Sequence, residues 1–162
     1  MLICFFDQKE IVHKEFVPPG QAVNAAFYVE VLRRLRENLR RKRPDQWQNN
    51  IWLLHHDNAP AHAALLTRRF LTDNSMTVVP HPPYSPDLAP SDFSIFPKLK
   101  MKLKGRRFQT VEKIQAESQA VLNTLRENDF QECLKNWQRR RDRCQASEGD
   151  YFENDAGLQC LR

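Results

Sequence analysis

The order of apolar and polar positions along the chain predicts a β-hairpin followed by a long helix. Residues 2–6 and 11–17 are two apolar, β-branched or aromatic runs, and the polar stretch 7–10 between them is typical of a hairpin turn. From about residue 24 to residue 41, apolar side chains recur at helical spacing with arginines between them. We therefore expect an amphipathic helix that ends before Pro44.

The next stretch predicts a strand, a helix and a second strand. Residues 51–56 form a short apolar run with polar neighbours, which is the pattern of a buried strand, and a helix is expected from Pro60 to about residue 71. Residues 76–79 predict another short strand. Five prolines within residues 80–90 then predict a stiff loop, because each proline ring fixes the backbone angle φ.

The remainder of the chain predicts helices only, over residues 92–101, 111–125 and 129–143. The whole order of hairpin, helix, strand, helix, strand and helices predicts an α/β fold with a mixed sheet. A length of 162 residues suits one domain, since domains cluster at about 100–150 residues. No apolar run is long enough to cross a membrane, so no membrane partner is expected.

Positive charge is gathered into three blocks, although Lys plus Arg exceed Asp plus Glu only by 25 to 20. The blocks are Arg33, Arg34, Arg36, Arg40, Arg41, Lys42 and Arg43; Lys98, Lys100, Lys102, Lys104, Arg106 and Arg107; and Arg139, Arg140, Arg141 and Arg143. Any single block is equally consistent with a solvated helix face. Three blocks together favour a polyanionic partner, most simply nucleic acid bound through its phosphates.

Two aspartates stand where metal ligands are commonly found. Asp57 follows the predicted buried strand, and Asp92 follows the proline-rich loop at a helix start. Carboxylates from separate elements can converge on a pair of Mg²⁺ or Mn²⁺ ions, an arrangement that serves phosphodiester cleavage. The same positions also suit helix capping, and from these residues alone capping is the commoner explanation.

Two longer motifs surround these aspartates. The stretch His-Asp-Asn-Ala-Pro-Ala-His at residues 56–62 resembles the second catalytic block of mariner transposases, and His-Pro-Pro-Tyr-Ser-Pro-Asp-Leu-Ala-Pro-Ser-Asp-Phe at residues 81–93 resembles their third. The 34 residues between Asp57 and Asp92 are the spacing of the mariner branch. Similarity extends to about residue 153, through shorter matches that include residues 149–152, whereas residues 154–162 are expected to form a divergent, disordered tail.

The resemblance implies a ribonuclease H-like core in which three acidic residues hold two divalent metals, Mg²⁺ or Mn²⁺, and cut and join DNA. Asp57 would then be the second acid and Asp92 the third, with Asn58 and His62 shaping the site. Asp87 is expected to order the proline loop through local hydrogen bonds. Phosphate contacts are expected from the following residues: Arg40, Arg41, Lys42, Arg43, Lys102, Lys104, Arg106 and Arg107.

The chain departs from the family pattern at its beginning. The first catalytic aspartate and the central first strand would precede the hairpin, and Asp7 lies in the predicted turn, where it is expected to be a turn former. From this we expect an incomplete set of acids with weak or absent activity, unpaired strand edges and self-association. The alternative is a non-catalytic nucleic-acid-binding or protein-interaction module derived from a transposon.

The expected surroundings of the chain follow from the same observations. The modules that read transposon ends would also lie upstream, so DNA binding is expected without sequence preference. The four cysteines lack the paired spacing of a zinc site and are expected to be reduced thiols. The expected location is the nucleus, or the cytoplasm if the protein is not retained on DNA.

Overall fold

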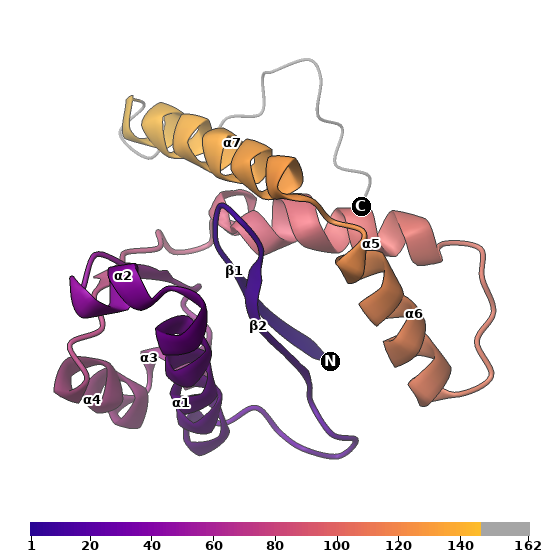
Figure 1. The fold of residues 1–162 in the computed structure, drawn as a ribbon, viewed down its shortest axis with the longest axis horizontal. Coiled ribbons are helices and arrows are strands. Elements are labelled where there is room, and N and C mark those ends of the chain that lie inside the picture. The colour runs from indigo at the N-terminus through magenta and orange to yellow at the C-terminus, as the bar shows by residue number, and fades with distance from the viewer. Residues whose placement is uncertain (147–162) are drawn as a thin grey trace.

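The computed structural model describes residues 1–146, so the matched stretch 149–152 and the expected tail 154–162 lie outside the described residues. A β-hairpin stands between two groups of helices (Figure 1). Its strands are β1 (Leu2–Phe6) and β2 (Ile11–Phe16), as the sequence pattern predicts. Asp7 closes the turn, because its Oδ1 accepts hydrogen bonds from the backbone N–H groups of Lys9 at 2.8 Å and Glu10 at 2.9 Å.

The first group of helices is built on α1 (Ala25–Lys42), which begins where Asn24 Oδ1 accepts the N–H of Phe27 at 2.9 Å. It ends before Pro44, as predicted, although a short helix that the pattern did not predict follows at once. The other members of this group are α2 (Pro44–Gln48), β3 (Leu54–His55), α3 (Pro60–Ala63), α4 (Leu65–Asp73) and β4 (Val78–Val79). Leu32 and Val31 of α1 are fully buried in the core of this group.

The second group of helices follows the proline-rich loop. Its members are a 3-10 turn η1 (Pro86–Leu88), a π-helical turn η2 (Ser91–Ile95), α5 (Phe96–Leu103), α6 (Val111–Asn123) and α7 (Glu127–Ala146). Its core contains the buried side chains of Ile95, Leu122 and Phe130. The three helices predicted over residues 92–143 are therefore present, with the first preceded by the π-helical turn.

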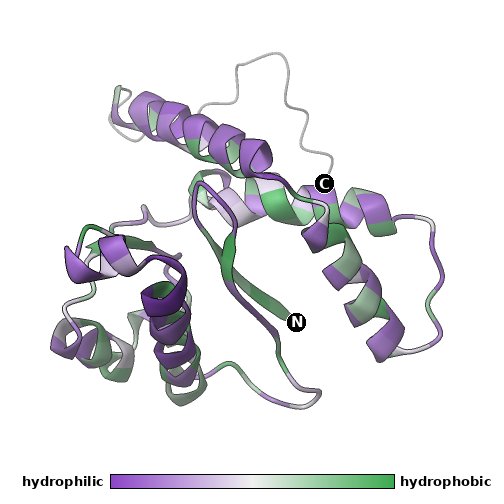
Figure 2. Cartoon of the chain, viewed as in Figure 1, coloured by the Kyte–Doolittle hydropathy of each residue, from purple (hydrophilic) through white to green (hydrophobic). Residues whose placement is uncertain are grey.

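The hairpin serves both cores because successive side chains of a strand point to opposite faces. Ile3 and Phe5 pack against the first core, whereas Leu2 and Phe6 pack against the second. Phe6 and Phe130 have ring centroids 5.7 Å apart. Figure 2 shows the corresponding pattern, with β1 hydrophobic along its length and α7 largely hydrophilic.

The α/β class is confirmed, but the strands form two separate pairs within residues 1–146. β1 pairs with β2 antiparallel, and β3 pairs with β4 parallel. The strand predicted over residues 51–56 is wrong in extent: only Leu54 and His55 are paired, and the side chains of Ile51 and Leu53 are 68% and 64% exposed. A strand needs backbone partners, and β4 offers two residues on one side only.

The helix predicted as one piece from Pro60 to residue 71 is broken at Ala64, whose φ of −61° and ψ of 147° are extended. Thr67 Oγ1 donates to the carbonyl oxygen of Ala61 at 2.6 Å, a buried bond that holds α4 against α3. Periodicity does not reveal such a break, because the apolar spacing continues through it. None of the helices within residues 1–146 is long and apolar enough to cross a membrane.

Candidate functional site

Asp57 lies just after β3, where two local groups orient its carboxylate. Oδ1 lies 2.7 Å from His62 Nδ1 and accepts the N–H of Ala59 at 3.1 Å. Burial alone would raise the pKa of Asp57, but the Ala59 N–H and the charge and hydrogen bond of His62 lower it from its usual value. Asp57 is therefore held as a carboxylate with a fixed direction.

The rings of Tyr28 and His56 pack against the ring of His62. The His62 ring lies 4.0 Å from the ring of Tyr28 and 4.9 Å from that of His56, centroid to centroid. The Tyr28 hydroxyl and His56 Nδ1 are 2.8 Å apart, and Tyr28 is buried on α1. Burial, with the neighbouring charge of His62, lowers the pKa of His56 to about 4. The first core thus fixes the position of Asp57.

Asp92 comes from the other group of helices, on η2. The N-cap of η2 is Pro90 and Asp92 lies in its first turn, so Asp92 is not the capping residue of this element. Its pKa is raised, first by burial and then by the negative charge of Asp57, while Lys100 and His81 oppose the rise. The two carboxylates therefore lie within electrostatic range of each other.

Asn58 connects the two sequence motifs directly. Its Nδ2 donates to the carbonyl oxygen of His81 at 2.8 Å, so residues that are far apart in the chain are joined beside Asp57. His81 Nδ1 also lies 3.2 Å from His55 Nε2. Burial, and after it the charge of His81, lowers the pKa of His55 to about 4.

Helix α7 holds the proline-rich loop in place. Trp137 Nε1 donates to the carbonyl oxygen of Leu88 at 3.0 Å, and Arg140 Nη1 donates to that of Asp87 at 3.0 Å. The hydrogen bond described for Asp87 is thus accepted by its backbone carbonyl oxygen from Arg140 of α7. It differs from the local hydrogen bonds that the sequence predicted for Asp87. The Trp137 ring also lies 4.9 Å from the ring of His55. One side chain of α7 therefore contacts both the segment before Asp57 and the loop before Asp92.

Comparison with known proteins places the chain in a family. Residues 1–49 match the family model of a transposase with a partial DDE domain. Over 94% of its length the chain is 34% identical to the solved structure of the Mos1 transposase catalytic domain with raltegravir and Mg, of which it covers 76%, with a TM-score of 0.84. The chain belongs to the mariner-type transposases. The likeness confirms the ribonuclease H-like, α/β catalytic-domain fold.

Other relatives are matched over only part of their length. The mariner Mos1 transposase of Drosophila mauritiana is 33% identical, with 94% of this chain and 45% of that protein covered. Human histone-lysine N-methyltransferase SETMAR is 27% identical, with 94% and 22% covered. A solved Mos1 mariner paired end complex with Mn is 34% identical, with 94% and 44% covered and a TM-score of 0.86. The chain thus spans less than half of both full proteins.

The basic residues differ in what surrounds them. In the first block, Arg43 binds Asp7 at 2.7 Å and Glu10 at 3.2 Å. Lys42 also binds Glu10, at 3.2 Å, and Arg40 binds Glu37 at 2.7 Å. In the second block, Arg106 binds Glu117 at 2.6 Å, whereas Lys102, Lys104 and Arg107 are exposed. The end of α5 and the loop after it therefore offer more available positive charge than the end of α1.

The donor set at Asp57 and Asp92 fits part of a divalent metal site in this mariner-type chain. Carboxylate oxygens are the ligands that Mg²⁺ and Mn²⁺ prefer, and a cation between two mutually repelling carboxylates relieves their repulsion. Within residues 1–146, however, no group of three or more His, Cys, Asp or Glu side chains is arranged to hold a metal ion. The described residues thus supply two acids and no third.

Sequence reasoning did not find several residues that shape the site. Tyr28 and Trp137 look like ordinary core and helix-stripe aromatics, and His55 and His56 like core or surface histidines. Lys100 belongs to a basic block, yet its charge reaches Asp92. Two of these residues carried a signal in the sequence, because His56 opens the second motif and His81 opens the third.

Proposed function

We propose that this chain is derived from a mariner-type transposase catalytic domain and that Asp57 and Asp92 bind Mg²⁺ or Mn²⁺ for phosphodiester chemistry on DNA. The observation that carries this is that the negative charge of Asp57 raises the pKa of Asp92, although the two carboxylates come from separate halves of the fold. Two helix caps would not require such proximity. The Mos1 structures with Mg and with Mn support the choice of metal.

Each residue around the carboxylates has a role in this proposal. Asp57 and Asp92 would hold the metal, which would supply activation of the attacking oxygen and stabilisation of the leaving oxygen. His62 and the Ala59 N–H aim the Asp57 carboxylate. Asn58 sets the distance between the two motifs by holding the His81 carbonyl. Lys100 places a positive charge near Asp92, where a DNA phosphate would approach.

We propose further that residues 1–146 by themselves give weak or no cleavage. The family's chemistry uses three acids, and the described residues bring two together. Removing one ligand of a metal pair weakens both metal binding and its ability to orient the reacting oxygens.

A titration with Mn²⁺ tests the metal site. We expect binding that Asp57→Asn and Asp92→Asn each weaken by about tenfold or more, because each removes a charged ligand. Asp73→Asn is the matched control, since Asp73 ends α4 and belongs to neither motif. Equal affinity in the wild type and all three variants would contradict the proposal.

DNA is the proposed partner, bound without sequence preference, and the exposed lysines that follow Asp92 support it. Affinity should fall steeply with salt, and Lys102→Gln with Lys104→Gln should reduce the slope of log affinity against log salt by about 2. Lys113→Gln with Lys135→Gln is the control pair of exposed lysines. A salt-independent affinity would rule out phosphate contacts.

The second candidate is a non-catalytic DNA-binding module. The observation that favours it is the pair of acids without a third in residues 1–146. A nicking assay on supercoiled DNA with Mn²⁺ separates the two functions. DNA binding without nicking, unchanged in Asp57→Asn, supports the module, and nicking that is lost in Asp57→Asn supports the enzyme.

We also propose self-association and a nuclear location. Val17 N–H donates to the Met1 carbonyl at 2.8 Å, so by the alternation of antiparallel pairing the backbone groups of Leu2, Cys4 and Phe6 face away from β2. An apolar strand with such an edge is a template for pairing with another chain. Light scattering tests self-association, and fluorescence microscopy of a tagged chain tests the nuclear location.

A further inference from the structure

The pattern Arg-Arg-Phe-x-Thr occurs twice in the chain, at residues 68–72 and at residues 106–110. Thr72 and Thr110 are the only Ser or Thr residues with an arginine three positions before them. Arginines placed just before a hydroxyl are a charge pattern that serine/threonine kinases read, because carboxylates in the kinase groove pair with the guanidinium groups. Both copies carry the same recognition residues, so the fold decides which threonine a kinase can use.

The first copy is locked inside α4. Thr72 Oγ1 donates to the carbonyl oxygen of Arg68 at 3.0 Å, within the helix. Phe70 and Leu71, which lie between the arginines and the threonine, are buried in the first core. A helix keeps residues three and four apart within about 5–6 Å of each other on one face. Extending this segment in a kinase groove would pull two apolar side chains out of the core, so Thr72 is a poor acceptor in the folded chain.

The second copy is open to a kinase. It lies in the loop between α5 and α6, which Figure 1 shows at the edge of the molecule, beyond the ends of both helices. Thr110 is exposed and extended, with φ −138° and ψ 158°, and Arg106 and Arg107 are exposed as well. Thr110 Oγ1 accepts the N–H of Lys113 at 3.3 Å, and within residues 1–146 no hydrogen bond uses its hydroxyl proton. None of residues 104–110 belongs to either core, so the loop can enter a kinase groove without unfolding.

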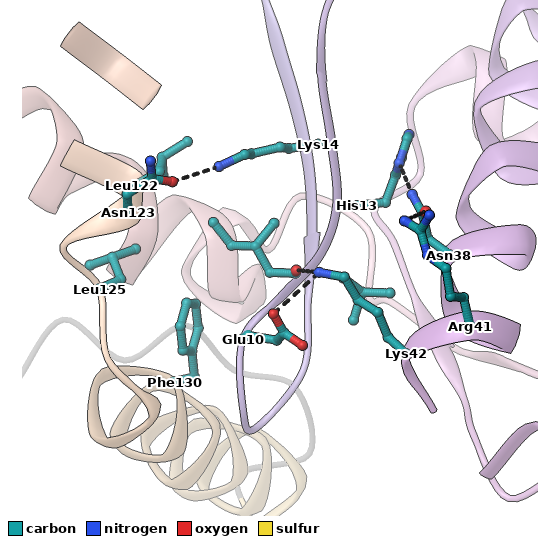
Figure 3. Close-up of a pocket in the computed structure, with 12 residues that line it drawn as sticks. Glu10, His13, Lys14, Asn38, Arg41, Lys42, Leu122, Asn123, Leu125 and Phe130 are labelled. Atoms are coloured by element: carbon teal, nitrogen blue, oxygen red, sulfur yellow. Dashed lines mark hydrogen bonds and ion pairs between the residues drawn. The ribbon is translucent and has the colours of Figure 1, made fainter. Parts of the chain in front are cut away.

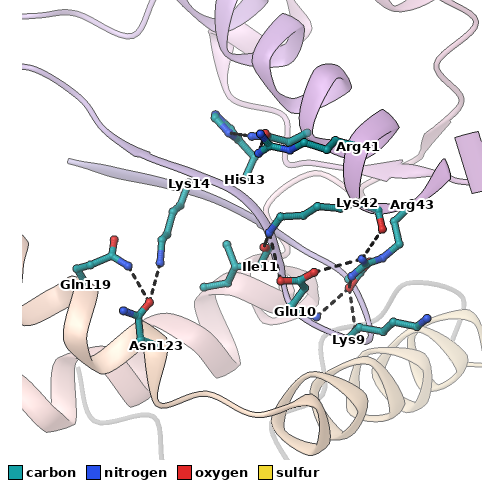
Figure 4. A network of polar contacts seen from close by, with 12 residues as sticks. Lys9, Glu10, Ile11, His13, Lys14, Arg41, Lys42, Arg43, Gln119 and Asn123 are labelled. Atoms are coloured by element: carbon teal, nitrogen blue, oxygen red, sulfur yellow. Dashed lines mark hydrogen bonds and ion pairs between the residues drawn. The ribbon is translucent and has the colours of Figure 1, made fainter.

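The helix that follows Thr110 is fixed at its opposite end. Asn123 Oδ1, at the end of α6, accepts from Lys14 Nζ at 3.2 Å and from Gln119 Nε2 at 2.8 Å, as Figure 4 shows. Leu122 is buried in the second core, and Figure 3 shows it next to Asn123, where Lys14 reaches α6. The 13 residues of α6 correspond to about 20 Å of helix. A kinase bound at the loop therefore leaves these contacts intact.

We propose that Thr110 is a phosphorylation site for an arginine-directed serine/threonine kinase. The kinase transfers the γ-phosphoryl group of ATP to Thr110 Oγ1. A P–O bond forms at that oxygen, the bond from the γ-phosphorus to the β–γ bridging oxygen breaks, the hydroxyl proton is released, and ADP leaves. The product is compatible with the fold, because the N–H groups at the start of a helix stabilise negative charge.

The phosphate changes the charge of the second basic block, since Arg106 and Arg107 immediately precede Thr110 in the same loop. It adds a charge of about −1.5 to −2 at pH 7. Lys102, Lys104 and Arg107 are exposed and are among the residues proposed to contact DNA phosphates. Phosphorylation should therefore weaken DNA binding, a consequence that rests on the proposed function.

The test treats the full chain with ATP and a purified kinase that requires an arginine three residues before its acceptor, and tandem mass spectrometry follows each threonine with time. The variants are Arg107→Gln and Thr110→Asn, which keeps a good helix-capping residue but cannot be phosphorylated in the same way. Arg69→Gln, in the first copy, is the matched control for Arg107→Gln. Peptides of residues 66–75 and 104–113 present both copies without the fold. Thermal melts confirm that each variant is folded.

We expect Thr110 in the full chain to be phosphorylated at least about tenfold faster than Thr72, because only Thr72 requires core residues to be exposed. The two peptides should react at similar rates, since neither is held by the fold. Arg107→Gln should slow modification of Thr110, and Arg69→Gln should not. Three results would overturn the proposal: no phosphate on Thr110, equal rates at both threonines in the full chain, or unchanged modification in Arg107→Gln.

Salt titrations of duplex binding test the consequence for DNA. Complete phosphorylation should reduce the slope of log affinity against log salt by about 2, whereas kinase-treated Thr110→Asn should bind as the untreated chain does. An unchanged slope in the phosphorylated chain would contradict this consequence. Absence of duplex binding by the untreated chain would instead contradict the proposed DNA partner, and mass spectrometry reports the phosphorylation of Thr110 independently of it.

Discussion

The two halves of the molecule, which share the hairpin, are packed very differently. Among the described residues, the core around α1 contains twelve buried side chains, whereas the core beneath α5, α6 and α7 contains three. Asp57 belongs to the first half and Asp92 to the second. The site is therefore assembled from a well-packed half and a thinly packed one, and we expect the position of Asp92 to be the easier of the two to disturb.

Three contacts beside the site connect the first half to the proline-rich loop and to α7. Asn58 bonds to His81, His81 Nδ1 lies 3.2 Å from His55 Nε2, and the Trp137 ring contacts the ring of His55. A small core cannot fix a loop by burial alone, so individual hydrogen bonds carry more of the positioning there. The following substitutions should show experimentally how the two halves differ in stability.

The largest effect is expected in the first core. Leu32 is fully buried on α1, and Leu32→Ala should lower the free energy of unfolding by about 4 kcal/mol, because it leaves a cavity among well-packed neighbours. Leu66→Ala, at a half-exposed position of α4, should cost about 0.5 kcal/mol or less. Urea denaturation measures both changes, and similar costs would show that the first core is not tightly packed.

A somewhat smaller and more local effect is expected in the second core. Phe130→Ala should cost about 3 kcal/mol, since the thin core can relax around the removed ring. Hydrogen exchange should then show lost protection in α6 and α7 with α1 unchanged. Phe108→Ala, outside both cores, is the control. Equal loss of protection in α1 would mean that the two halves unfold together.

A still smaller change should loosen the hold of α7 on the proline-rich loop. Trp137→Phe keeps an aromatic ring but removes the N–H that binds the Leu88 carbonyl, which should cost about 1 kcal/mol. If Asp92 binds metal, Mn²⁺ affinity should fall as well. Trp47→Phe is the matched control, because no hydrogen bond of the Trp47 indole is present within residues 1–146. Unchanged Mn²⁺ affinity in Trp137→Phe would show that the loop holds its position without α7.

A further effect, of about the same size for each ring, is expected on the pH dependence of stability. Burial lowers the pKa of His55 and of His56 from 6.5 to about 4 in the fold. Between pH 6.5 and about 4 the unfolded chain binds more protons, so the free energy of unfolding should fall as the pH falls. We expect about 1 kcal/mol from each ring after allowing for solvent screening.

Stability curves of the wild type, His55→Gln and His56→Gln from pH 7 to pH 4 measure this effect. Each substitution should flatten the curve in that window. A wild-type curve that is flat between pH 6.5 and 4 would show that these rings titrate normally in the folded chain.

Helix and hairpin positions were predictable because local patterns decide them. The apolar spacing of α1, the Asn24 cap and the turn chemistry of Asp7 act within a few residues. The strand over residues 51–56 was predicted too long, because a strand does not depend on the local pattern alone. An apolar run states which residues can be buried, but a strand also needs backbone partners that other parts of the chain must bring.

The sequence by itself determined the family, the two motifs and the aspartates that they contain, because those features are runs of neighbouring residues. Only the tertiary structure decided that the charge of Asp57 reaches Asp92 and that Trp137 contacts both His55 and the loop before Asp92. These contacts join residues that are far apart in the chain. Their formation depends on how two cores pack against opposite faces of one hairpin, which no local pattern encodes.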